Sequence, residues 1–227
     1  MYTYILIDML TISIPLALSF EKRIYYAGKW KYLFPALSVT AVVFIVWDHF
    51  FTIHGIWGFN PQYLLGISIF SLPLEEILFF FCVPFSCVFI YELVCKYGRE
   101  SFISQNVKSI TWGLAGILFV VGIFNFSKIY TSMTFLSLSI FLLVHVLLLK
   151  SPYLAKFYGA YVITLLPMLV VNGILTNGIR SVAPGPVVWY DNFYNLGIRM
   201  IGIPVEDFMY SMLLLLLNVT IYERLKK

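Results

Sequence analysis

Two pairs of acidic residues stand in strongly apolar parts of this chain. Glu75-Glu76 and Glu206-Asp207 each come just after a proline, a residue that is well tolerated where a helix starts. Apolar residues precede and follow both pairs. A single acid there would suit the helix N-terminus as a cap. Two pairs at matching positions favour a functional role, because ionisable side chains close to hydrocarbon are functional hypotheses by default.

The chemistry that such pairs can perform is proton transfer. An apolar environment disfavours the charged form of a carboxyl group, and two neighbouring carboxyl groups disfavour double ionisation. A carboxylic acid and a carboxylate can therefore stand side by side. Phe79, Phe80 and Tyr210 follow closely in the sequence, and their ring faces can stabilise a transient cation. The pattern indicates proton-driven chemistry on a lipophilic alkene, and it leaves open which residue is the acid and which is the base.

Asp48 and Asn172 stand at equivalent positions in two other apolar segments. Two interpretations of Asp48 remain: an interfacial residue bonded to loop backbone, or a third acid that orients or reprotonates the first acidic pair. Asn172 cannot titrate, so the two sites are chemically unequal. His49 and His54 could join Asp48 around a metal ion. The chain has only three histidines, however, and we predict no metal site.

The elements that position these acids are predicted to be transmembrane helices. Apolar residues make up 61% of the chain and charged residues only 11%, whereas a soluble domain carries roughly a quarter charged residues. Stretches long enough to cross roughly 30 Å of hydrocarbon lie near 3–20, 33–51, 72–94, 110–126, 131–149, 155–173 and 203–222. We therefore predict an all-α integral membrane protein of seven transmembrane helices, with residues 1–227 forming a single membrane domain.

The chain also contains an internal repeat. A shift of 131 residues aligns three blocks without a gap: Tyr63-Leu-Leu-Gly with Tyr194-Asn-Leu-Gly, Pro73-Leu-Glu-Glu with Pro204-Val-Glu-Asp, and Ile90-Tyr-Glu with Ile221-Tyr-Glu. We expect two three-helix repeats, about 1–95 and about 131–227, joined by a linking helix at about 108–127. The linking helix makes both repeats run the same way through the membrane, so the repeat is parallel. Both acidic pairs should then lie at one depth, near the outer face, on helices that face a shared cavity.

The distribution of positive charge predicts the orientation. Twelve of the fifteen Lys and Arg residues fall on alternate loops and on the C-terminal tail, and the exceptions are Lys128, Arg180 and Arg199. Cytoplasmic loops carry such an excess. We expect a multi-pass protein of the cell membrane with its N-terminus outside and its C-terminus in the cytoplasm. Because the charge follows the loops, we predict no nucleic-acid partner.

These motifs resemble those of the membrane lycopene cyclases of the heterodimeric type, here as a fused single chain carrying both repeats. The resemblance rests on the two proline-acid motifs together with Trp47-Asp48, Phe59-Asn60 and Asn172-Gly173. It implies an isomerase, an intramolecular lyase without net redox change, that cyclises the linear ends of lycopene to β-rings through γ-carotene to β-carotene. No cofactor is expected. We expect the catalytic residues to be Glu75, Glu76, Glu206 and Asp207, and the substrate-binding residues to be Asp48, Asn172, Phe79, Phe80 and Tyr210.

Other functions remain as alternatives. A cyclase of another carotenoid, such as one of fifty carbons, would look similar. A small-molecule membrane transporter also uses parallel repeats and buried acids, but it would more often show helices interrupted at mid-membrane. A retinal photoreceptor needs a lysine in its last span, and 203–222 contains none. The expected partners are a lipophilic carotenoid and the lipid bilayer, and the sequence leaves open whether the protein is a homo-oligomer.

Overall fold

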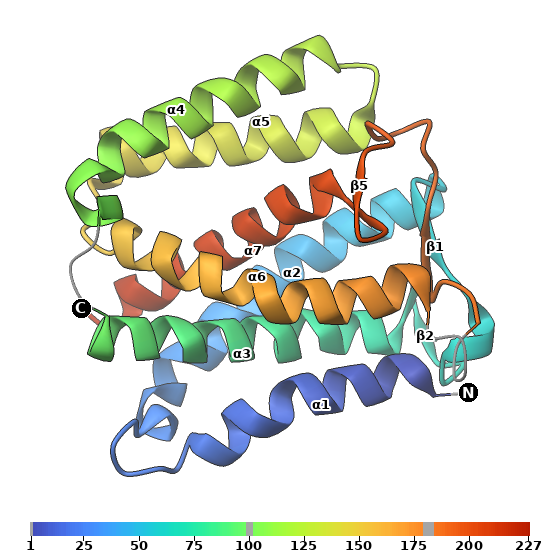
Figure 1. The fold of residues 1–227 in the computed structure, drawn as a ribbon. Helices are drawn as coiled ribbons and strands as arrows, with labels where there is room; N and C mark the ends of the chain where they lie inside the picture. The colour runs from blue at the N-terminus through green and yellow to red at the C-terminus, as the bar shows by residue number, and fades with distance from the viewer. Residues whose placement is uncertain (1, 99–101, 179–183) are drawn as a thin grey trace.

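The computed structural model describes residues 2–98, 102–178 and 184–227, and within these ranges the chain forms seven α-helices (Figure 1). They are α1 (Thr3–Leu18), α2 (Trp30–Ile53), α3 (Leu74–Tyr97), α4 (Phe102–Phe124), α5 (Ile129–Val144), α6 (Leu154–Asn177) and α7 (Val205–Leu225). Six of the helices are long and apolar enough to cross a membrane, α5 with the turn that continues it, and α1 is an apolar helix of 16 residues. The predicted all-α membrane architecture is confirmed.

Short irregular elements connect the helices. Two 3₁₀ turns, η1 (Tyr26–Lys29) and η2 (Pro61–Tyr63), precede α2 and follow the first strand, and a π-helical turn, η3 (His145–Leu149), extends α5. Four short strands form two hairpins. One joins β2 (Ser68–Ile69) to β3 (Leu72–Pro73), and the other joins β5 (Arg199–Met200) to β6 (Ile203–Pro204).

The two prolines of the acidic motifs end these hairpins and cap the helices. Pro73 is the N-cap of α3 and Pro204 is the N-cap of α7, both with extended backbone angles. Because Leu72 and Ile203 lie in strands, the third and seventh helices start two residues later than the sequence pattern predicted. The acids consequently fall in the first helical turn of each helix.

The repeat is visible as a two-fold relationship between the halves. Helices α1 and α5 have 16 residues each, and α2 and α6 have 24 each. Helix α2 packs on α7 as α6 packs on α3, and α1 packs on α3 as α5 packs on α7. The hairpins match as well, with positive φ at Phe70 in one and at Ile201 in the other. The linking helix α4 stands outside this arrangement, against α5 and α6 (Figure 1).

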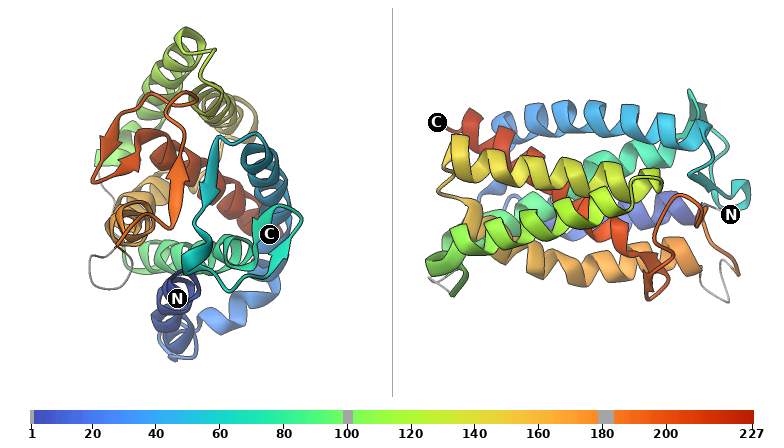
Figure 2. Two further views of the ribbon diagram at one scale, coloured as in Figure 1. Left: turned by 90° about the vertical axis from the view of Figure 1, so that its right-hand side faces the viewer. Right: turned by 90° about the horizontal axis from the view of Figure 1, so that it is seen from above.

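A third pair of strands joins the two repeats. Strand β1 (Trp57–Phe59) pairs antiparallel with β4 (Val188–Tyr190), and Gly58 lies opposite Trp189, its own equivalent at the shift of 131 residues. The view onto this end of the bundle shows both strands side by side near its middle (Figure 2, left). The strands therefore lie close to the axis that relates the repeats.

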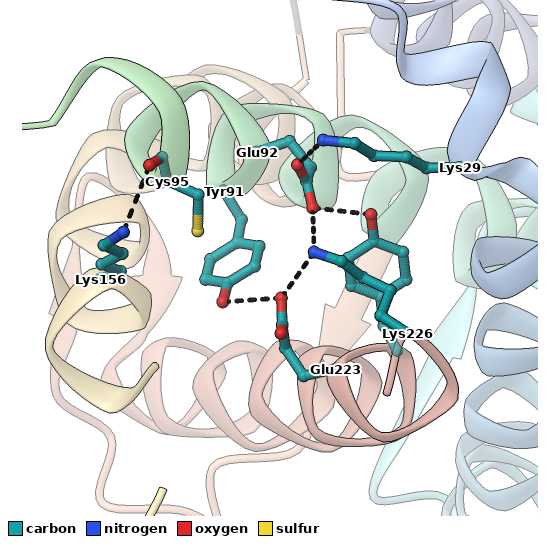
Figure 3. A network of polar contacts seen from close by, with 8 residues as sticks. Lys29, Tyr91, Glu92, Cys95, Lys156, Glu223 and Lys226 are labelled. Carbon is teal, nitrogen blue, oxygen red and sulfur yellow. Dashed lines mark hydrogen bonds and ion pairs between the residues drawn. The ribbon is translucent and has the colours of Figure 1, made fainter. Parts of the chain in front are cut away.

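The opposite end of the bundle is tied by charged side chains (Figure 3). Tyr91 of α3 donates to Glu223 of α7 at 3.1 Å, and its equivalent Tyr222 donates to Glu92 at 2.6 Å. Lys226 bridges the two carboxylates, at 2.9 Å from Glu92 and 3.0 Å from Glu223. Lys29, at the start of α2, also pairs with Glu92. This network holds α2, α3 and α7 together at the end where the C-terminus lies.

The termini lie at opposite ends of the bundle, as an odd number of crossings requires (Figure 1). The N-terminal end carries the strands, and the C-terminal end carries most of the basic residues. Arg99 and Arg180, which entered the charge count, lie outside the described residues. Which end faces the cytoplasm remains a prediction from that charge distribution.

Candidate active site

Three carboxyl groups from three helices meet in one cavity at the strand-bearing end of the bundle. Asp48 of α2, Glu76 of α3 and Asp207 of α7 all line a cavity of about 360 Å³. Asn172 of α6 lines it too, so each of the four central helices contributes one polar side chain. Most of the remaining lining is apolar and runs along α1, α3, α6 and α7. The arrangement places acids beside a space shaped for an apolar molecule.

Aromatic hydrogen-bond donors hold the three acids. The hydroxyl of Tyr4 donates to Glu76 Oε2 at 2.5 Å, and the hydroxyl of Tyr130 donates to Asp207 Oδ1, also at 2.5 Å. Tyr4 and Tyr130 are the second residues of α1 and α5, so this contact is repeated across the two-fold axis. Donors of this kind fix the direction of each carboxyl group.

Two further contacts distinguish the halves. Tyr190 donates its hydroxyl hydrogen to Asp207 Oδ2 at 2.8 Å, so both oxygens of Asp207 accept hydrogen bonds. The indole N–H of Trp57 donates to Asp48 Oδ1, whereas the buried Oδ2 of Asp48 has no partner among the described residues. Tyr190 stands in β4, outside the helices, where burial and then the charge of Asp207 raise its pKa well above the usual value. Tyr190 is therefore a neutral donor.

The structure separates the two members of each acidic pair. Glu75 and Glu206 are fully buried but do not line the cavity. Each instead accepts a backbone N–H from the loop before its own hairpin, Glu75 from Leu65 at 2.5 Å and Glu206 from Leu196 at 2.8 Å. Glu206 also accepts from the hydroxyl of Thr131 at 2.6 Å. Adjacent residues point about 100° apart around a helix, which is why one acid faces the cavity and its neighbour faces the loop.

The aromatic residues singled out in the sequence are divided in the same way. Phe79 and Tyr210 line the cavity, and Tyr210 lies 5.0 Å from Phe44 and 5.7 Å from Trp47 between ring centroids. Phe80 is buried outside the cavity lining and lies 6.3 Å from Phe44. Cavity-lining residues with rings near the acids thus include Phe79, Tyr210, Trp57 and Tyr190.

The histidines near Asp48 do not converge on it. His49 Nδ1 lies 2.6 Å from the hydroxyl of Ser71, and His54 Nδ1 lies 2.7 Å from the carbonyl oxygen of Phe50. In the part of the chain that the structure describes, no group of three His, Cys, Asp or Glu side chains could hold a metal ion. Of the two interpretations of Asp48, its bond to the Trp57 side chain and its place on the cavity fit the third acid better than a loop anchor.

Several residues of the site escaped the sequence analysis. Tyr4, Tyr130, Tyr190 and Trp57 contact the acids, but nothing in the sequence separates them from the other aromatic residues of the chain. Asp8 is different. It is fully buried on α1, one turn after Tyr4, and neither carboxyl oxygen has a hydrogen-bond partner in the described structure. An acid inside an apolar helix was a signal that could have drawn attention to it.

Comparison with known proteins adds a family match. The family model described as lycopene cyclase matches residues 1–94 and 127–225. The unmatched segment between these ranges contains most of α4, the helix that stands outside the repeat. The chain is also 26% identical over 98 residues to a bifunctional lycopene cyclase/phytoene synthase of Aspergillus oryzae, a match that covers 41% of this chain and 16% of that protein. No solved structure matches the chain.

Proposed function

The chain belongs to the lycopene cyclase family, and on this premise we propose that it closes β-rings on the linear ends of lycopene. The proposed products are γ-carotene, with one ring, and then β-carotene, with two. The reaction is an isomerisation in carotenoid biosynthesis, and it takes place in the membrane that holds both enzyme and substrate. The observation that carries the proposal is the meeting of Asp48, Glu76 and Asp207 at an apolar cavity.

The proposed reaction starts with a proton. A carboxylic acid of the site protonates the terminal double bond of one linear end, which leaves a tertiary cation. The next double bond attacks this cation with its electron pair and closes a six-membered ring, so the positive charge moves into the ring. A carboxylate then removes a ring proton, and the electrons of that C–H bond form the ring double bond. One proton is added and one is lost, so no oxidant or reductant is required.

The hydrogen bonds suggest how the roles are divided. Asp207 accepts hydrogen bonds on both oxygens, which suits an ionised carboxylate because that form only accepts. We assign Asp207 as the base. Asp48 offers one oxygen without a protein partner, and Glu76 lines the same cavity, so these two form the proton-donating side. Under this assignment Glu75 and Glu206 shape the loops before the hairpins rather than transfer protons.

The cation that travels through the reaction needs stabilisation without a nucleophile that would trap it. The rings of Phe79, Trp57 and Tyr210 line the cavity beside the acids. A cation over an aromatic face is stabilised by about 0.5–2 kcal/mol, and more where water is excluded. Aromatic rings therefore supply the electrostatic environment, and the small number of polar groups limits capture of the cation by water.

The function is tested by producing the chain in cells that accumulate lycopene. We expect lycopene to be replaced by one-ringed and then two-ringed products, separated by chromatography. In heavy water each new ring should carry deuterium at the protonated carbon. Unchanged lycopene in cells that contain folded protein would contradict the proposal. Supplying a linear fifty-carbon carotenoid in a parallel culture determines whether the cavity prefers that longer substrate.

A further inference from the structure

The two-fold relationship between the repeats predicts two equivalent side openings in the bundle. Helices α1 and α6 both flank α3, and at the equivalent place α5 and α2 both flank α7. A groove between α1 and α6 along α3 should therefore have a counterpart between α5 and α2 along α7. The residues that fill the two grooves can be compared one by one, because the paired helices have equal lengths.

Large aromatic side chains fill the groove between α5 and α2. Five residues, which we call the aromatic plug, occupy it: Phe44, Trp47, Phe51, Phe80 and Tyr210. The rings touch in sequence, with centroids 5.0 Å apart for Phe44 and Tyr210 and 5.6 Å apart for Trp47 and Phe51. Phe51 also lies 5.9 Å from Tyr130 of α5, so the plug spans the groove.

Smaller side chains occupy four of the five equivalent positions in the other groove. Met168 stands where Phe44 does, Val171 where Trp47 does and Leu175 where Phe51 does. Ser211 stands in place of Phe80, and only the position of Tyr210 keeps a large ring, as Phe79. All five of these residues line the cavity. The cavity therefore exists in one groove because the side chains there are small.

The same groove is the one that reaches the surface of the bundle. Leu10 and Ile14 of α1 line the cavity and are nevertheless 71% and 67% exposed. On the facing helix α6, Pro167 also lines the cavity and is exposed. The lining residues on the plugged side, Asp48 of α2 and Tyr130 of α5, are by contrast each 1% exposed. Because both helices are membrane spans, an opening between them faces hydrocarbon rather than water.

We propose that the groove between α1 and α6 is the single lateral portal through which the carotenoid enters from the bilayer, and that the aromatic plug has closed its symmetry-related counterpart. The proposal rests on the proposed function for the identity of the occupant. A polyene hydrocarbon fits the portal, because its rim consists of the apolar residues Leu10, Ile14, Pro15, Pro167 and Val171. The enzyme is thus one-sided although its helices are nearly two-fold symmetric.

The length of the cavity determines how the substrate lies in it. On α3 the lining runs from Glu76 to Ile90, which at 1.5 Å per residue is about 21 Å. A forty-carbon carotenoid is roughly as long as the 30 Å hydrocarbon layer is thick. One end of the molecule can therefore reach the acids while the remainder lies along α3 and extends past Leu10 and Ile14 into lipid. The second end must enter through the same portal in a later event.

Two pairs of variants test the portal in the full chain. Val171→Trp copies Trp47 of the plug, and its control Val170→Trp makes the same change at a neighbouring residue that is 61% exposed and outside the cavity lining. Ile14→Trp narrows the rim from α1, and its control is Ile140→Trp, at the equivalent position of α5, 57% exposed and also outside the lining. Each control adds the same bulk on the lipid-facing surface.

Two quantities are measured in membranes that contain lycopene: the initial rate of cyclisation and the total carotenoid that co-purifies with the protein. We expect Val171→Trp and Ile14→Trp to lower both by about tenfold or more, and both controls to stay within about twofold of the unmodified chain. Should Val171→Trp fail to fold, Ile14→Trp still decides, since its side chain faces outward.

The outcomes separate this inference from the proposed function. Equal binding and equal rates in a portal variant and its control would overturn the portal. Lycopene that binds but is never cyclised by the unmodified chain would overturn the proposed function, and the comparison of bound carotenoid would still test the portal. Loss of binding in all four variants alike would also overturn the portal, because the lipid-facing controls would then matter as much as the rim.

Discussion

The hydroxyl groups of Tyr4 and Tyr130 occupy matching positions on α1 and α5, and each donates a hydrogen bond of 2.5 Å to the cavity-facing acid of its own repeat. The acids that receive these bonds, Glu76 and Asp207, line a common cavity. Symmetric donors thus orient two acids that the rest of the site treats differently, because Asp207 has a second donor in Tyr190. The predictions below follow from this combination of symmetry and difference.

We expect Glu76→Gln and Asp207→Asn to lower the cyclisation rate by about two to four orders of magnitude, because the amides keep the shape of the site but cannot transfer a proton. Under the assignment above, Asp48→Asn should also slow the reaction, by a different factor. The measurement is pigment analysis at matched protein levels. Small and equal losses in all three variants would remove the assignment of roles.

The outer members of the pairs should behave differently. Glu75→Gln and Glu206→Gln exchange a buried carboxyl oxygen that accepts a loop N–H, so we expect a loss of about 1–3 kcal/mol in the free energy of unfolding. The activity of the protein that remains folded should fall far less than in Glu76→Gln. Thermal unfolding in detergent, together with the rate per folded molecule, distinguishes the two effects. A catalytic loss as large as that of Glu76→Gln at full stability would contradict this division.

Asp8 is expected to lower stability in the unmodified protein. Its carboxyl group is fully buried, and its oxygens have no partner among the described residues. Replacing it by the apolar Asp8→Leu should raise the free energy of unfolding by about 1–3 kcal/mol, since an unsatisfied buried polar group costs that much. If the acid also supplies protons to the site, turnover should fall in the same variant. A destabilised Asp8→Leu protein would show that the carboxyl group has a partner after all.

Lys226 should stabilise the C-terminal end of the bundle, because it bridges Glu92 and Glu223. We expect Lys226→Met to lower the free energy of unfolding by about 1 kcal/mol, and its exposed neighbour supplies the control Lys227→Met. Burial lowers the pKa of Lys226, but hydrogen bonds and charges from Glu92 and Glu223 outweigh burial and raise it overall. The contribution should therefore be complete below the ordinary lysine pKa and disappear as the pH rises through the higher value of the folded state. Unfolding curves recorded at increasing alkaline pH measure this directly.

The charge distribution predicts the topology. Reporter proteins fused to the C-terminus should be active only in the cytoplasm, and tags at the N-terminus should be accessible only from outside. Moving basic residues to the strand-bearing end supplies the control, because it should weaken or invert this preference. A cytoplasmic N-terminus in the unmodified chain would contradict the predicted orientation, and it would place the acids near the inner face.

The sequence was sufficient for the helices, for the repeat and for the acids, because apolar runs and a constant shift of 131 residues are properties of the chain itself. It was not sufficient to separate Glu75 from Glu76. Helical geometry states that neighbours point apart, but which of them faces the cavity depends on how α3 is rotated against α1 and α6. The donors Tyr4 and Tyr130 were missed because loops of unequal length give α1 and α5 a different shift from α3 and α7.

The pairing of Gly58 with Trp189 across the axis bears on ancestry. In a symmetric dimer of one three-helix unit, the residue at this position would face its own copy. Here the ring of Trp189 lies over Gly58 in the space that a β-carbon there would need. Two first repeats would place glycine against glycine and leave a gap, and two second repeats would set one tryptophan against the other. The halves have diverged into complementary partners, so neither can now replace the other in a self-paired assembly.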